Sequence, residues 1–381
     1  MKFIYSIGCP FNFSGLGKTA HYQTLAIKEI GAGLKVFAPC YNEKNLQGVQ
    51  VKSFALNPWL GKIHGRISNY YLKDLLFDNW VTKQLKNENC DVFWGWTGHC
   101  LNSINNLRNR KVTPIFLLER QSLEVETQKR LLEEEYKRLG VSFKLITDDI
   151  LKRNTEEQKK VDYIMVNSSF IAESYLNMGY DKSIIKVNPL GVDTQRFSNV
   201  RRQDDGVFRV IYIGLITIRK GIQRLIEVWK KLNLKNSELL LVGRFYPKDK
   251  NYFRKIFENC PNLVHINGTD KPEEYYRKSS IYVMPSVEDG FPSVVLEAMS
   301  VGLPAIVSNR VGSKECVENG VNGFIYKFDN HDELSEKILY FYKNRDKIQE
   351  FGNSARENIQ KYSWTNYIKR EKEILKEIIG N

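Results

Sequence analysis

Short runs of β-branched and aromatic residues alternate with helix-patterned stretches along almost the whole chain. In the first half these runs occupy residues 2–6, 35–38, 91–94, 113–118, 163–166 and 184–187. A second series occupies residues 208–214, 238–243, 263–267, 281–284, 304–308 and 324–326. Strands alternating with helices are typical of doubly wound parallel sheets. Because 381 residues exceed what one core usually organises, the two series predict two Rossmann-like domains.

The boundary between the two series is marked by composition. Residues 188–193 read Asn-Pro-Leu-Gly-Val-Asp, and residues 201–206 are mostly charged or polar. We therefore expect an N-terminal Rossmann-like domain over residues 1–195 and a C-terminal Rossmann-like domain over residues 196–360, both α/β. A last helix over 361–381 is expected to pack back towards the N-terminal domain. Ligands of such sheets bind at the carboxyl ends of the strands, so the fold predicts a cleft between the domains.

The segment over residues 286–299 follows a predicted strand and carries two carboxylates around a glycine turn. Gly290 is expected to adopt backbone angles closed to other residues, and Pro292 suits the first turn of a helix. Free amides at a helix start attract phosphate and sugar oxygens. Asp289 and Glu297 can accept hydrogen bonds from hydroxyl groups. The pattern favours a sugar donor site, although solvated acids on an ordinary loop would give the same spacing.

Several motifs occur together in the order of one known family. They are Met-Pro-Ser at 284–286, Asp-Gly-Phe-Pro at 289–292, Glu-Ala-Met at 297–299, Gly-Leu-Pro-Ala-Ile-Val at 302–307, Gly-Val-Asn-Gly-Phe at 320–324, the turn at 188–193 with Phe197, and the loop from Gly214 to Arg-Lys-Gly at 219–221. This set resembles the retaining GT-B glycosyltransferases of family four, also called glycosyl transferases group 1. The resemblance covers nearly the whole length and implies two Rossmann-like domains facing across a cleft. It implies that residues 1–195 form the acceptor-side domain and that residues 196–360 form the domain that binds the nucleotide sugar.

The resemblance implies roles for the acidic segment. The first acid of the family contacts hydroxyls of the donor sugar, and the second holds the ribose; here these are Asp289 and Glu297. The family usually has glutamate at both positions, so the shorter Asp289 is a departure, and the neighbouring Glu288 is an alternative that either substitutes for it or faces solvent. The donor-binding residues implied around them are Gly290, Phe291, Pro292 and Ser293.

A basic loop follows the first strand of the second series. Many relatives place an arginine directly after the glycine that matches Gly214, where this chain has Leu215. Arg219 is the candidate for the missing cation, beside Lys220. Breaking a bond between a sugar and a diphosphate develops negative charge on the leaving phosphate, which fixed cations stabilise. The alternative is that both are ordinary loop cations.

A glycine-rich loop lies between the first strand and a helix. Gly15 and Gly17 are candidate donor-binding residues, because their amides can approach a phosphate. A dinucleotide site is disfavoured because the second strand ends in Ala-Pro-Cys at 38–40, with no acid for a ribose. A P-loop is excluded because the earlier glycine that it requires falls at Asn12.

Three further residues follow strands of the first series. Some relatives have a histidine where this chain reads Glu119-Arg120. Arg120 is a candidate contact of acceptor or donor with Glu119 orienting it, and a structural ion pair between the two is the alternative. His99 is a second cleft candidate, whose alternative role is that of a loop histidine with satisfied hydrogen bonds.

Charge and cysteine usage exclude several classes. The net charge of +13 and a pI near 9.2 favour anionic partners, but no nucleic-acid-binding motif is present. The six cysteines form no Cys-x-x-Cys pair and no Asp-x-Asp occurs, so no metal site is predicted and a reduced, cytosolic setting fits best. No run approaches a membrane span. Aromatic and basic residues over 54–86 suit either a membrane surface or an ordinary amphipathic helix.

The sequence therefore predicts a metal-independent retaining hexosyltransferase of cell-surface glycan synthesis. Its donor would be a nucleotide diphosphate sugar, with no other cofactor, and its acceptor a saccharide or a lipid-linked saccharide. We expect it in the cytoplasm, at most peripheral at the inner face of the cell membrane, with an anionic membrane surface as a further partner and no nucleic acid. The alternatives are a nucleotide-sugar epimerase of the same fold and a non-catalytic nucleotide-sugar-binding subunit.

Overall fold

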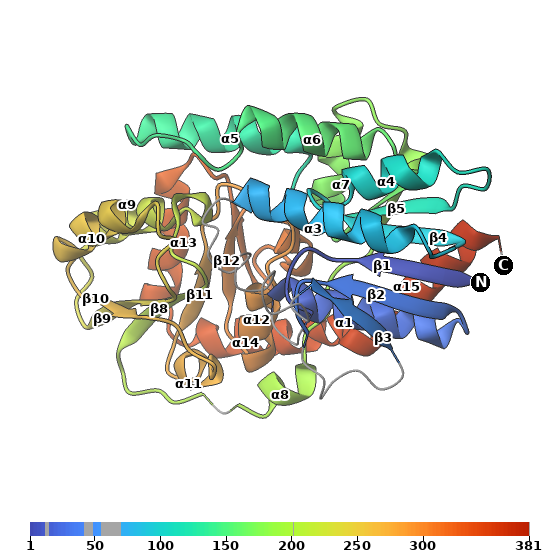
Figure 1. Cartoon of the computed structure of the whole chain (residues 1–381). Coiled ribbons are helices and arrows are strands. Elements are labelled where there is room, and N and C mark those ends of the chain that lie inside the picture. Colours follow the sequence, from blue (N-terminus) through green and yellow to red (C-terminus); the bar gives the residue numbers. More distant parts are fainter. Residues whose placement is uncertain (12–14, 42–48, 55–69, 201, 381) are drawn as a thin grey trace.

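A computed structural model describes residues 1–11, 15–41, 49–54, 70–200 and 202–380 (Figure 1). Within these residues, two separate parallel sheets lie at opposite ends of the molecule. We call the part that carries the seven-stranded sheet the first domain and the part that carries the six-stranded sheet the second domain. The expected fold class, α/β with two doubly wound parallel sheets, is confirmed.

The sheet of the first domain has the strand order β3-β2-β1-β4-β5-β6-β7, and that of the second has the order β10-β9-β8-β11-β12-β13. The strands of the first are β1 (Lys2–Ser6), β2 (Gly33–Ala38), β3 (Gln50–Ser53), β4 (Val92–Trp96), β5 (Ile115–Arg120), β6 (Tyr163–Val166) and β7 (Ile185–Val187). The strands of the second are β8 (Phe208–Ile213), β9 (Ser237–Val242), β10 (Leu263–Ile266), β11 (Ile281–Met284), β12 (Ala305–Ser308) and β13 (Gly323–Tyr326). In each sheet the strand that comes first in the sequence, β1 or β8, lies in the middle of the sheet, as in a doubly wound fold.

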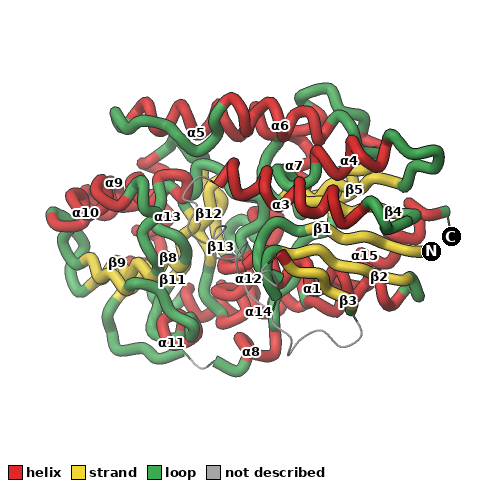
Figure 2. The backbone as a smooth tube through the Cα atoms, viewed as in Figure 1, coloured by secondary structure: helices red, strands yellow, loops and turns green. Residues whose placement is uncertain are grey.

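Helices connect the strands and cover both faces of each sheet (Figure 2). Those up to the crossover between domains are α1 (Gly15–Glu29), α3 (Tyr70–Leu85), α4 (Leu101–Arg108), α5 (Val125–Arg138), α6 (Asp148–Gln158), α7 (Ser169–Leu176) and α8 (Thr194–Ser198). Those that follow are α9 (Ile222–Leu232), α10 (Lys250–Glu258), α11 (Glu273–Tyr276), α12 (Ser293–Val301), α13 (His331–Lys343), α14 (Lys347–Ile359) and α15 (Trp364–Ile379). Short 3-10 turns include η3 (Lys182–Ile184), η4 (Ile218–Lys220), η5 (Gly312–Cys316) and η6 (Gln360–Tyr362).

The strand predictions fail at one edge. β3 pairs with β2 at the border of the first sheet, yet its sequence, Gln-Val-Lys-Ser, has one β-branched apolar residue and two polar neighbours. Edge strands of this kind lack the long apolar runs of strands that are buried on both faces. The alternation rule therefore finds the central strands and misses this one.

The last helix returns to the first domain. Leu375 and Ile378 of α15 are buried in the same cluster as residues of β1, β2 and α1, and α15 runs beside α1 in Figure 1. At its start, Trp364 lies against the crossover, where a Cβ atom on Gly191 would come within 2.7 Å of the Trp364 ring. The amide of Val192 donates to the carbonyl of Tyr362 at 2.8 Å. Both passages of the chain between the domains therefore run side by side.

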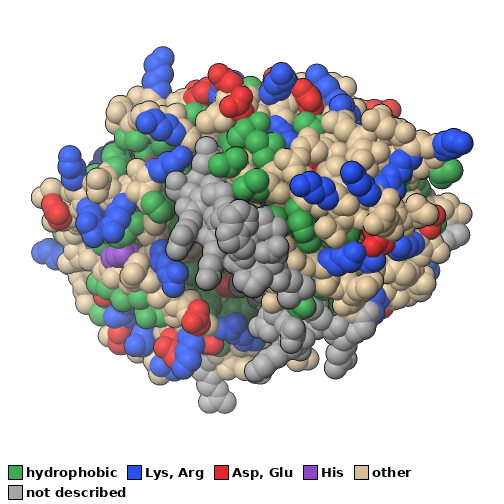
Figure 3. Space-filling model, in the orientation of Figure 1, with side chains coloured by type: hydrophobic (Ala, Val, Ile, Leu, Met, Phe, Trp, Pro, Cys, Tyr) green, Lys and Arg blue, Asp and Glu red, His purple; other side chains and the backbone are tan. Residues whose placement is uncertain are grey.

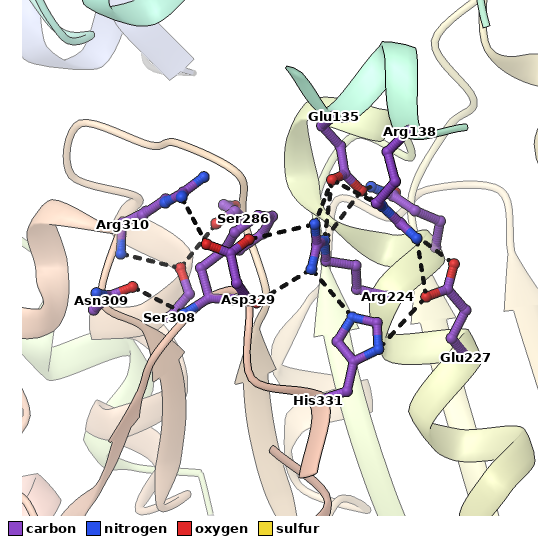
Figure 4. A network of polar contacts seen from close by, with 12 residues as sticks. Glu135, Arg138, Arg224, Glu227, Ser286, Ser308, Asn309, Arg310, Asp329 and His331 are labelled. Atoms are coloured by element: carbon purple, nitrogen blue, oxygen red, sulfur yellow. Dashed lines mark hydrogen bonds and ion pairs between the residues drawn. The ribbon is translucent and has the colours of Figure 1, made fainter. Parts of the chain in front are cut away.

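The C-terminal end of α5 packs against the second domain, although α5 precedes the crossover between the domains. Tyr136 is buried in the hydrophobic cluster of the second domain, and its hydroxyl donates to Asp249 at 3.1 Å. Glu135, 3% exposed, accepts hydrogen bonds from Arg224 of α9 and from Arg138, with the shortest contact 2.6 Å from Arg224 (Figure 4). The C-terminal end of α5 therefore contacts the second domain, although α5 lies before the expected domain boundary at residue 195.

Charged side chains are spread over the surface. On the face shown in Figure 3, Lys and Arg side chains lie over both domains and are interspersed with acids. The positive charge of the chain is therefore not gathered in one patch on that face.

Candidate functional site

The basic loop after β8 and the acidic segment after β11 form one unit. The amide of Val287 donates to the carbonyl of Arg219 at 2.9 Å. Gly221 has a φ of 68°, and a Cβ there would lie 1.8 Å from the carbonyl oxygen of Pro285. Only glycine combines that left-handed backbone with so close an approach. Gly221 thus allows the loop that carries Arg219 and Lys220 to lie directly against the start of the acidic segment.

Each cation of the loop is matched by one carboxylate. Nε of Arg219 donates to Oε1 of Glu288 at 2.5 Å, and Nζ of Lys220 is in direct contact with Oδ2 of Asp289. Asp289 is 6% exposed. Two positive and two negative charges therefore stand side by side at the carboxyl ends of β8 and β11, and the pairs must open or share their donors when a charged ligand binds.

Glu288 neither faces solvent nor lies free, so that interpretation of the sequence is wrong. Its side chain is fully buried, and Oε1 also accepts from Nε2 of Gln128 on α5 at 2.6 Å. Glu288 therefore belongs to the contact between the domains, whereas Asp289 beside it pairs with Lys220.

Gly290 is required for a different reason from the one predicted. Its φ is not among the left-handed glycines, but a Cβ there would lie 2.2 Å from the carbonyl oxygen of Gln121 in the first domain. The hydroxyl of Ser168 donates to the carbonyl of Gly290 at 2.9 Å. Phe291 is buried. The turn is therefore the place where the loop after β11 meets the first domain.

The start of α12 differs slightly from the prediction. Pro292 is the N-cap with φ −66° and ψ 111°, and Ser293 is the first helical residue. Glu297 thus lies just over one turn into the helix. Burial raises its pKa to about 7, opposed by the positive charge of Lys18, and the hydroxyl of Tyr276 donates to it at 3.4 Å.

Asp289 and Glu297 share one neighbourhood. The pKa of Tyr282 on β11 is raised by its burial and by nearby charges that include both carboxylates. The charges of both acids therefore act on the same buried tyrosine hydroxyl.

Lys18 is a further candidate residue, because its charge acts on Glu297, and the sequence analysis did not single it out. It lies in the first turns of α1, its Nζ is 5.4 Å from the centre of the Trp364 ring, and burial lowers its pKa although the charges of Glu297 and Asp193 oppose this. The signal in the sequence was a lysine directly after Gly17 in a loop between strand and helix. Gly17 is buried, and Gly15, with a φ of 50°, is exposed at the start of α1.

Glu119 and Arg120 have separate hydrogen-bond partners, so Glu119 does not orient Arg120 directly and the alternative, an ion pair between them, is not formed either. Arg120 donates to the carbonyl of Leu123 and, at 2.8 Å, to Oε1 of Gln128. Glu119 accepts from Gln23 at 2.7 Å and from Gln121 at 3.1 Å. Burial and the charge of Glu371 raise its pKa to about 8.

His99 pairs with Asp74 of α3, with 3.2 Å between Nε2 and Oδ1. Burial lowers the pKa of the ring, but the charge and hydrogen bond of Asp74 together with the charge of Glu157 outweigh burial, so that the net pKa is raised. Its Nδ1 is buried and unpartnered among the described residues. The imidazole also lies against Gly8, where a Cβ would overlap it at 1.8 Å.

The aromatic and basic segment over residues 54–86, which suited either a membrane surface or an ordinary amphipathic helix, lies partly outside the described residues, since residues 55–69 are not described. Its later part forms α3. No helix among the described residues is long and apolar enough to cross a bilayer, and these residues contain no cluster of three potential metal ligands.

Comparison with known sequences matches mainly the second half of the chain. The family "Glycosyl transferases group 1" matches residues 193–358. The capsular polysaccharide biosynthesis glycosyltransferase CapM of Staphylococcus aureus is 28% identical over 158 residues, which are 40% of this chain and 41% of CapM. The chain spans only about half the length of the curated relatives that it matches.

Solved structures match over both domains. Sucrose-phosphate synthase from Thermosynechococcus elongatus superposes with a TM-score of 0.76 at 16% identity, covering 100% of this chain and 99% of that one. HepE of Anabaena, solved in complex with UDP and glucose, gives a TM-score of 0.70 at 15% identity over 99% of this chain and 100% of HepE. At these identities the likeness shows the fold, which is GT-B. The part of this chain that matches the glycosyl transferases group 1 is thus its second domain, over residues 193–358.

Proposed function

We propose that the chain is a retaining hexosyltransferase that uses a nucleotide diphosphate sugar. The observation that carries the proposal is the double pair Arg219–Glu288 and Lys220–Asp289 at the carboxyl ends of β8 and β11, on the segment that leads into α12 and Glu297. This set combines cations for a diphosphate with acids for hydroxyl groups. UDP and glucose in the HepE structure and the polysaccharide role in the name of CapM support this donor class and glycan synthesis.

The residues would act in the following way. Lys220 and Arg219 stabilise the charge that develops on the leaving diphosphate, because fixed cations lower the barrier most where charge appears in the transition state. Asp289 accepts hydrogen bonds from the donor sugar, and Glu297 holds the ribose. Since Asp289 already pairs with Lys220, binding of the donor places the sugar and its phosphate on the two partners of one ion pair.

The acceptor hydroxyl would attack the anomeric carbon from the face that the diphosphate leaves. The bond from the acceptor oxygen to the anomeric carbon forms, the bond to the diphosphate breaks, and the hydroxyl proton passes to the leaving phosphate. No metal and no other cofactor takes part in this proposal. The acceptor is a saccharide or a lipid-linked saccharide that approaches from the first domain.

Consumption of donor tests the proposal. Wild-type chain is incubated with glucose, galactose and N-acetylglucosamine donors of UDP, GDP and ADP, with and without a set of saccharide acceptors. Release of nucleoside diphosphate that depends on acceptor supports the transferase. Conversion of the donor sugar without release of nucleotide would identify an epimerase, and binding without any turnover would identify a binding subunit.

For a lipid-linked acceptor we further propose contact with an anionic membrane surface at the inner face of the cell membrane. Cosedimentation with vesicles that contain phosphatidylserine, at low salt, measures this contact. Absence of binding would remove the membrane from the proposal and leave the transferase intact.

A further inference from the structure

Glu288 is a buried carboxylate for which the proposed reaction has no use so far. Its side chain is fully buried, so it cannot touch a donor in this arrangement. A carboxylate without water is unfavourable unless charged or hydrogen-bonding partners surround it. Its partners therefore indicate what it is there for.

Those partners come from both domains. Arg219 of the second domain and Gln128 of the first both donate to Oε1, at 2.5 Å and 2.6 Å. Arg219 in addition donates to the hydroxyl of Ser122 in the first domain at 3.3 Å. Arg219, one cation of the proposed donor site, is thus held by a residue of each domain, Glu288 of the second and Ser122 of the first.

The orientation of Gln128 is fixed by its neighbours. Its amide oxygen accepts from Arg120 at 2.8 Å, and its amide nitrogen donates to Glu288. Arg120 in turn donates to the carbonyl of Leu123 at 2.7 Å. A continuous row of hydrogen bonds therefore runs from the end of β5 through Gln128 of α5 and Glu288 to Arg219.

We propose that Glu288 is a positioning residue of the transferase. It holds the guanidinium of Arg219 where the diphosphate leaves. Because Glu288 also binds Gln128 of the first domain, the position of Arg219 depends on the contact between the domains. The inference rests on the proposed function, since it assigns Glu288 to the same site. It extends that function by making the cation effective only when α5 lies against the loop after β11.

Glu288→Gln is the direct test. Glutamine keeps the size of the side chain and one acceptor oxygen, and its NH2 group occupies the position of Oε2, which has no partner among the described residues. The charge that holds Arg219 is lost. We expect kcat/KM for donor consumption to fall about tenfold, mostly through kcat, because charged hydrogen bonds are about twice as strong as neutral ones and Arg219 acts on the leaving group.

A double-variant cycle separates positioning from a merely structural role. Arg219→Met is expected to lower kcat by about 100-fold. If Glu288 acts through Arg219, adding Glu288→Gln to Arg219→Met lowers kcat no further. An equal loss from Glu288→Gln in both backgrounds, or wild-type kcat and KM for Glu288→Gln alone, would overturn the inference.

Glu135→Gln is the matched control. Glu135 is a buried carboxylate at the same domain boundary and on the same helix as Gln128, but it pairs with Arg224 and Arg138. We expect a lower unfolding temperature with kcat/KM within about twofold of wild type, since surface and core changes away from the site act on stability. Should Glu288→Gln fail to fold, Gln128→Met replaces it in the cycle, because it breaks the row of hydrogen bonds without removing a charge.

Calorimetry with UDP, GDP and ADP separates failure of the inference from failure of the proposed function. A wild-type chain that binds none of the three, or binds one and consumes none of its glucose, galactose and N-acetylglucosamine donors, overturns the transferase and the role of Glu288 together. A wild-type chain that binds and consumes a donor, beside an unaffected Glu288→Gln variant, overturns the role of Glu288 alone.

Discussion

Replacing Gly290 by alanine tests whether the two domains must meet at the loop after β11. The added Cβ would lie 2.2 Å from the carbonyl oxygen of Gln121 and 2.8 Å from Cδ1 of Ile171. The methyl end of Ile171 can rotate away, but the carbonyl of Gln121 is backbone. Ordinary contact begins at 3.4 Å, so the backbones must separate by 3.4 minus 2.2, or about 1.2 Å.

The expected loss follows from that displacement. Inserting a methyl group into a packed contact costs about 1–3 kcal/mol, which corresponds to a fall in kcat/KM of roughly 5-fold to 150-fold if the strain appears when the site assembles. Initial rates of donor consumption at low donor concentration measure kcat/KM, and thermal unfolding is followed in parallel. Gly33→Ala is the control, because the nearest atom to its Cβ would be 3.7 Å away. A Gly290→Ala variant with wild-type kcat/KM and wild-type stability would refute the argument.

Four further predictions concern charged groups. Lys220→Ala should lower kcat for donor consumption by about 10²–10³; unchanged turnover would contradict its role. Because the pKa of Glu297 is about 7, calorimetric affinity for UDP should rise from pH 6 to pH 8, and Glu297→Gln should reduce that rise to the part that comes from ionisation of the terminal phosphate of UDP. The pKa of Glu119 is raised to about 8, so its contribution to stability is present below about pH 4.5 and lost as the pH rises through 8; urea unfolding at pH 5 and pH 9 should differ less in Glu119→Gln. The pKa of Glu135 is lowered to about 2, so its contribution is present above about pH 4.5 and lost as the pH falls through 2, and Glu135→Gln should lower the unfolding free energy at pH 7 by about 3 kcal/mol.

Local patterns were sufficient to predict the fold. Strands that are buried on both faces carry the run of apolar residues that a parallel sheet needs, so β1, β6 and β11 lie at the predicted residues. The apolar stripe of α9, with Leu225 and Trp229, is buried as its spacing predicts. β3 was missed because a polar edge strand has no such run.

The candidate site was only partly predictable, because its decisive contacts join distant parts of the chain. Glu288 and Gln128 are 160 residues apart, and no local spacing shows that one is the partner of the other. For the same reason Glu288 was open to interpretation as a solvent-facing acid, and Lys18 received no role. Gly290 illustrates the same limit, since its need for glycine comes from a carbonyl of the other domain. The roles of Asp289 and Glu297 remain predictions.

The return of α15 to the first domain has a consequence for biosynthesis. Leu375 and Ile378 complete a cluster that otherwise contains residues near the other end of the chain, among them Phe3 and Ala26. A ribosome makes the early residues first, and many domains fold as they emerge. Because α15 follows the second domain in the sequence, the first domain cannot complete this cluster until residues 364–379 have been synthesised.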